Sequence, residues 1–191
     1  MENSENIFKG NKKMSKEILN TAYHEAGHAA AFIFLDLKFK IVSIEPKNES
    51  LGRVTGRVLS KRTLKALEFA TTVINKDKIE KDLIIDIAGP IAEAKFKGRF
   101  NHLAASADYH KISDFLFRIF ENQQLITAYY NYIFLLAKNI IDRRDTWNYI
   151  ETLARTLIEK RTMTYNECMQ LYYEAYQKLM ESDNGNLGSL K

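Results

Sequence analysis

The stretch TAYHEAGHAAAFIF, residues 21–34, places two histidines four positions apart, with a glutamate directly after the first. Alanine dominates this stretch, and apolar residues recur every three or four positions from residue 18 onward, which predicts a helix from Ser15 to about Leu35. Each helical residue advances by about 100°, so His24 and His28 lie about 40° apart on one face, one turn above the other. Two imidazoles at this spacing can bind one metal ion.

Glu25 falls about 60° from His28 around the predicted helix, beside the two histidines and not between them. A base that acts on metal-bound water belongs in this position. Catalytic zinc takes three protein ligands and leaves a fourth position for water. The alternative is a helix on which the histidines are only surface residues. If a metal binds, the spacing alone leaves five candidates for the third ligand: Glu93, His102, Asp108, His110 and Asp114.

The rest of the chain predicts a mainly helical (α+β) fold with a small antiparallel β element. KIVSIEP (40–46) and LGRVTGRVL (51–59) both alternate, and turn-forming residues separate them, so we expect them to pair. INKDKIEKDLIIDIAGPIAEAKF (74–96) has helical periodicity. Proline removes a helix hydrogen bond and disfavours the α conformation of the residue before it. We therefore expect this helix to be interrupted or kinked at Gly89-Pro90.

Further helices are expected toward the C-terminus. Ser106 can cap a helix that begins with ADYHKIS, and Thr164 with Glu167 forms a capping box at the start of the last helix. The sequence has no repeat or linker that would divide it. The predicted helices after Ser106 span about 107–120, 123–141, 146–160 and 165–181. The predicted organisation is a flexible leader (1–13), a single domain (14–182) and a flexible tail (183–191).

The composition narrows the class of protein. Of the 191 residues, 46% are hydrophobic and 27% are charged, which is typical of a globular chain and not of a disordered or fibrous one. We expect no membrane segment, because no apolar run approaches the ~20 residues that a spanning helix needs. The single cysteine, Cys168, excludes an internal disulfide and suits the cytoplasm. The net charge of +4 is spread among acidic residues, so we expect no nucleic-acid partner.

Several stretches in order resemble the peptidase domain of the FtsH family of ATP-dependent zinc metalloproteases, peptidase family M41. They are HEAGHA (24–29), VSIEPKNESLGRV (42–54), IDIAGPIAEAKFKG (85–98), AASADYHKISDF (104–115) and IETLARTLIEKRTMTYNE (150–167). The likeness spans about residues 15–178. The resemblance implies a helical metallopeptidase domain that binds one Zn²⁺ per chain. It also implies hydrolysis of peptide bonds in unfolded or partner-delivered proteins.

The resemblance also implies roles for single residues. His24, His28 and Asp108 bind the zinc, Asp108 because it matches the aspartate of the family's Ala-Ser-Asn-Asp segment, and Glu25 is the general base. Glu93 either orients a ligand histidine through a hydrogen bond or is an exposed helix charge. The strand that carries Leu51, Gly52 and Val54 either offers its edge to an extended peptide substrate or only closes the core.

The sequence departs from the family pattern at several points. It has no Gly-x-x-x-x-Gly-Lys-[Ser/Thr] phosphate loop, so a motor would have to be a separate ATPase partner. Ala107 replaces the usual asparagine, and Pro90 interrupts a helix that is normally continuous. The sequence leaves a homo-oligomer open. The alternative function is a catalytically silent, peptidase-like binding or regulatory module that acts through protein contacts.

Overall fold

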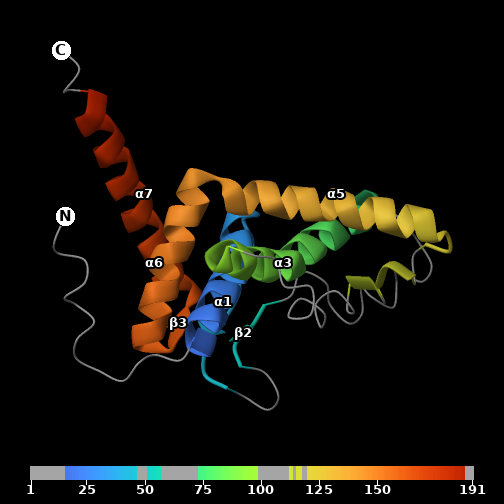
Figure 1. Cartoon of the computed structure of the whole chain (residues 1–191), viewed down its shortest axis with the longest axis horizontal. Coiled ribbons are helices and arrows are strands. Elements are labelled where there is room, and N and C mark those ends of the chain that lie inside the picture. Colours follow the sequence, from blue (N-terminus) through green and yellow to red (C-terminus); the bar gives the residue numbers. More distant parts are fainter. Residues whose placement is uncertain are drawn as a thin grey trace.

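The computed structural model describes residues 16–46, 51–56, 73–98, 112–113, 115–117 and 120–187. The fold is mainly helical with one small antiparallel sheet, which confirms the predicted α+β class (Figure 1). The elements, in chain order, are α1 (Lys16–Phe34), β1 (Ile41–Ser43), β2 (Arg53–Val54), α3 (Val73–Lys97), α5 (Gln123–Asp142), α6 (Arg144–Lys160), β3 (Thr162–Thr164) and α7 (Tyr165–Leu187).

The helix α1 is the centre of the molecule, and α3, α5 and α6 all pack against it. In Figure 1, α3 crosses α1, α5 runs along one side of the molecule, and the end of α7 points away from the other elements. Small residues line the α1–α3 contact. A Cβ atom added at Gly27 would lie 2.6 Å from the Cβ of Ala92 and 2.7 Å from the carbonyl oxygen of Ala88. The two helix backbones therefore lie close together where they cross.

The sheet has the strand order β2-β1-β3, and both pairs are antiparallel. Val42 pairs with Val54 on one side and with Met163 on the other, so the expected pairing of the two N-terminal strands is confirmed. Strand β3 was not predicted. Its three residues directly precede α7 and carry the capping-box Thr164, and nothing in so short a stretch indicates a distant strand partner.

Of the two alternatives predicted for Gly89-Pro90, the interruption is wrong, because α3 runs from Val73 to Lys97 with Pro90 inside it, and the kink stays a prediction. Proline cannot donate the usual backbone hydrogen bond, but its φ angle suits a helix. Both neighbours of this turn, Ala88 and Ala92, are fully buried. Packing against α1 therefore keeps the helix continuous where the local sequence favours a break.

Of the C-terminal helices, α5 and α7 begin at the predicted residues, and α6 begins two residues earlier than predicted, at Arg144. The Asn122 side chain caps α5 through the backbone N–H groups of Gln124 and Leu125. The predicted capping box of α7 is confirmed, since the Thr164 backbone N–H donates to Glu167 at 2.8 Å and the Glu167 N–H donates to Thr164 Oγ1 at 3.4 Å. However, α7 continues to Leu187, so the first part of the predicted tail is helical. Adding a residue to an existing helix costs much less than nucleating one, which favours this extension.

Some predictions lie outside the described residues. They include the leader 1–13, the cap at Ser15, the last residues of the tail, and the cap at Ser106. Of the predicted helix 107–120, residues 112–113 and 115–117 are helical. Across the described ranges, no helix has both the length and the apolar character that a membrane crossing requires.

Candidate metal centre

The crossing of α1 and α3 brings His24, His28 and Glu93 together. The Nε2 atoms of the two histidines lie 3.0 Å apart, and their ring planes meet at 74°. Both rings come from the same face of α1, as the four-residue spacing predicts. The second helix, α3, supplies the oxygen atoms that contact the other nitrogen of each ring.

Each histidine Nδ1 atom has an oxygen from α3 beside it. His28 Nδ1 lies 2.6 Å from the carbonyl oxygen of Ile85, and His24 Nδ1 lies 3.0 Å from Glu93 Oε2. A carbonyl or carboxylate oxygen only accepts, so both Nδ1 atoms carry the hydrogen. In a neutral imidazole the other nitrogen is then an acceptor. The two Nε2 atoms therefore face each other as acceptors.

Two acceptor nitrogens 3.0 Å apart need a cation between them, either a proton or a metal ion. Zinc binds imidazole nitrogen at about 2.0–2.1 Å, which this separation allows. Gly89 leaves room for it, since a Cβ atom there would lie 2.3 Å from His28 Nε2. The two histidines and the small residue beside them thus fit a zinc ion.

Both carboxylate oxygens of Glu93 have a partner. Oε2 accepts from His24, and Oε1 accepts from the Lys97 ammonium. Burial acts to raise the pKa of Glu93, but the hydrogen bonds from His24 and Lys97 outweigh it, so the pKa lies below its usual value. The side chain is only 14% exposed, which excludes the alternative of an exposed helix charge.

The structure places Glu25 beside the histidines and buries it, with 6% of its surface exposed. Gly52, which directly precedes β2, covers the Glu25 side chain. A Cβ atom added at Gly52 would lie 2.7 Å from Glu25 Oε1 and 2.8 Å from Thr21 Cγ2. Leu51 is half exposed, and Val54 pairs with β1. Of the three residues proposed for substrate binding, Gly52 thus lies directly against the expected base.

The predicted third ligand, Asp108, lies outside the described residues, as do the other candidates His102, His110 and Asp114. Among the residues that the structure does describe, no three histidine, cysteine, aspartate or glutamate side chains gather where one metal ion could bind. Ligation by Asp108 therefore stays a prediction. Glu93 contacts Nδ1 of His24, whereas the nitrogen that faces His28 is Nε2.

Sequence reasoning missed Lys97 and the carbonyl of Ile85. Lys97 follows Glu93 by four residues, and this spacing on a helix is a signal for an ion pair. A backbone carbonyl carries no sequence signal, so the Ile85 contact needed the structure. No protein-family model matches the chain, and no curated protein matches it either.

Proposed function

We propose that the protein is a zinc-dependent metalloendopeptidase. The observation that carries this proposal is the pair of Nε2 atoms 3.0 Å apart, each on a ring whose Nδ1 atom contacts an oxygen of α3. Partners of this kind fix the tautomer and orientation of metal-binding histidines. The resemblance to the FtsH family supports zinc as the metal and Asp108 as the third ligand.

In this proposal His24, His28 and Asp108 hold the ion. Zinc, when bound, lowers the pKa of its water toward about 7 and polarises the carbonyl group of the substrate. The Glu25 carboxylate accepts a proton from the attacking water and transfers it to the leaving amine. Burial of Glu25 beneath Gly52 supports this role, because it fixes the direction in which the carboxylate points.

An extended peptide is the substrate that the surroundings of Glu25 favour. β2 is at the edge of the described sheet, and its other side pairs with β1. A peptide that adds to such an edge binds through backbone hydrogen bonds and needs no defined sequence. Because only an unfolded segment can add in this way, we propose unfolded proteins, or proteins delivered by a partner ATPase, as substrates.

The first test compares hydrolysis of casein by the wild-type protein and Glu25→Gln, with zinc content measured by elemental mass spectrometry. We expect about one zinc per chain in both proteins, and turnover lower by about 10²–10⁴ in the variant, the usual contribution of a general base. Glu17→Gln is the matched control, because Glu17 is an exposed glutamate in the first turn of the same helix.

Two results would contradict the proposal. Equal turnover by the wild-type protein and Glu25→Gln would exclude Glu25 as the base. A wild-type protein that binds no zinc and cleaves nothing would favour the binding or regulatory module. His24→Ala and Asp108→Ala test the ligands, since each should remove most of the zinc if the assignment is right.

A further inference from the structure

Lys97 is a largely buried lysine that is linked to the histidine pair through Glu93. Its ammonium contacts Glu93 Oε1, and its side chain is only 13% exposed. Lysine is rarely buried unless it is paired. A second pair on α3 has the same four-residue spacing, Asp77 with Lys81 at 3.0 Å, but those side chains are 61% and 32% exposed. The Glu93–Lys97 pair therefore differs from it by its burial.

Helix stability alone gives little reason for this burial. A pair at this spacing on a solvated surface stabilises a helix only weakly. Burying a pair costs desolvation of both charges, and apolar residues of the same volume are often as stable. Lys97 is also in the last turn of α3, where the helix dipole favours a cation, but an exposed lysine would gain the same.

The contacts of Glu93 indicate what the buried lysine does. His24 Nδ1 engages only Oε2, at 3.0 Å, and Lys97 engages only Oε1. A glutamate held at one oxygen can still rotate about its side-chain torsions, and the second contact restricts that rotation. The orientation of the His24 ring depends in turn on the carboxylate that accepts its N–H.

We propose that Lys97 is a positioning residue for the metal centre. Its ammonium holds the Glu93 carboxylate where it accepts the His24 Nδ1–H, and this keeps His24 Nε2 directed at His28 Nε2. The inference rests on the proposed zinc site. It assigns to Lys97 a contribution to zinc affinity that passes through Glu93 and not through the stability of the fold.

The test measures the zinc dissociation constant by competition with a chromogenic chelator, using zinc ion alone as the probe. We expect Lys97→Met to weaken zinc binding about tenfold, the lower end of the 10–100-fold loss found when a partner of a metal ligand is removed. Lys97→Arg should restore affinity to within about threefold, because its guanidinium also donates to a carboxylate.

A double mutant separates positioning from a structural role. If Lys97 acts through Glu93, Lys97→Met should cause no further loss in the Glu93→Ala background. Losses that multiply in the double mutant would overturn the proposal. Lys81→Met is the matched control, since it removes a more exposed pair of the same spacing from α3 and should leave zinc affinity unchanged.

The remaining outcomes distinguish this inference from the proposed function. If the wild-type protein binds zinc and His24→Ala does not, but Lys97→Met binds it as tightly as wild type, the role of Lys97 is wrong and the zinc site stands. If the wild-type protein binds no zinc, both are wrong. Should Lys97→Met fail to fold, Lys97→Ser, too short to reach Glu93, replaces it with the same expected loss.

Discussion

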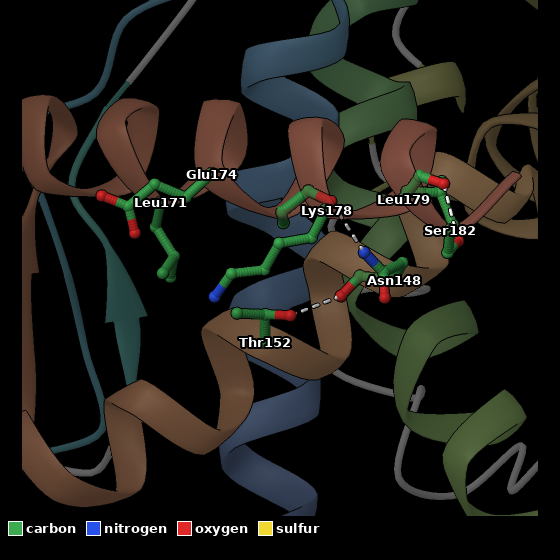
Figure 2. Close-up of a pocket in the computed structure, with 8 residues that line it drawn as sticks. Asn148, Thr152, Leu171, Glu174, Lys178, Leu179 and Ser182 are labelled. Carbon is green, nitrogen blue, oxygen red and sulfur yellow. Dashed lines mark hydrogen bonds between the residues drawn. The ribbon is translucent and has the colours of Figure 1, made fainter. Parts of the chain in front are cut away.

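Two helix pairs in this protein are built in opposite ways. At the α1–α3 crossing, alanine and glycine let the backbones approach, and the polar side chains meet one another. Between α6 and α7, larger side chains leave a groove of about 210 Å³, lined by Asn148 and Thr152 of α6 and by α7 residues from Leu171 to Ser182 (Figure 2).

Three of the polar side chains that line this groove donate hydrogen bonds to backbone carbonyl oxygens. Asn148 donates to the carbonyl oxygen of Ala175 at 3.2 Å, and Thr152 donates to that of Asn148 at 2.8 Å (Figure 2). Ser182 donates to the carbonyl oxygen of Leu179 at 2.7 Å. The two hydroxyl groups are thus satisfied within their own helices, and the Asn148 amide group joins α6 to α7. A cavity is the usual first hypothesis for a site, but here the close-packed crossing holds the chemically coupled groups.

If the two helix pairs differ in this way, a methyl group added at the α1–α3 crossing should have the largest effect on zinc affinity and on stability. In Gly89→Ala the new Cβ atom would lie 2.3 Å from His28 Nε2 and 2.6 Å from Cε1, so the ring must move. We expect zinc affinity to fall by at least about 100-fold. Overpacking should also lower the free energy of unfolding by about 1–3 kcal/mol. Chelator competition and urea denaturation of the zinc-free protein measure the two effects.

Normal zinc affinity in Gly89→Ala would contradict the proposed difference between the two helix pairs. It would mean that the crossing opens easily, and that the close approach of the helices does not define the geometry of the histidines. A loss of stability without a loss of affinity would have the same meaning for the site.

The next effect should be confined to catalysis. In Gly52→Ala the added Cβ atom would lie 2.7 Å from both Cγ and Oε1 of Glu25, so this side chain must move from its buried position. A misplaced catalytic group can cost about 10²-fold in rate, so we expect kcat for casein hydrolysis to fall by about this factor.

Zinc content is the control for this variant, because Gly52 borders the expected base and not the histidine nitrogens. Normal zinc with a reduced kcat would separate the position of Glu25 from metal binding. An unchanged kcat would instead show that Glu25 does not act from the position in which the structure holds it.

The features that sequence predicted are local ones. The spacing of His24 and His28, the pairing around Val42 and the capping box at Thr164 each depend on residues a few positions apart, or on two strands that follow one another in the sequence. Periodicity and turn chemistry report such features directly. They account for the helical class of the fold and for the histidine pair.

The features that sequence missed depend on distant contacts. Strand β3 pairs Thr162 with Ser43, and the two side chains are separated by 119 residues along the chain. Pro90 was expected to interrupt or kink α3, and the buried contact with α1 keeps the helix uninterrupted. The contact of His28 with the Ile85 carbonyl follows from the helix crossing alone. Local propensity is a weak guide wherever tertiary packing opposes it.

The smallest effect should come from the same kind of substitution in the α6–α7 groove. Ala175 is buried and lines the groove, so Ala175→Met extends a flexible side chain into free space. Methionine is a good helix former, and filling a cavity commonly stabilises a protein, so we expect a gain of about 0.5 kcal/mol in the free energy of unfolding. Zinc affinity and casein hydrolysis should not change. Urea denaturation measures the gain. A loss of stability as large as that of Gly89→Ala would show that the two helix pairs are equally close-packed. Close packing would then give no reason to place the site at the α1–α3 crossing and not between α6 and α7.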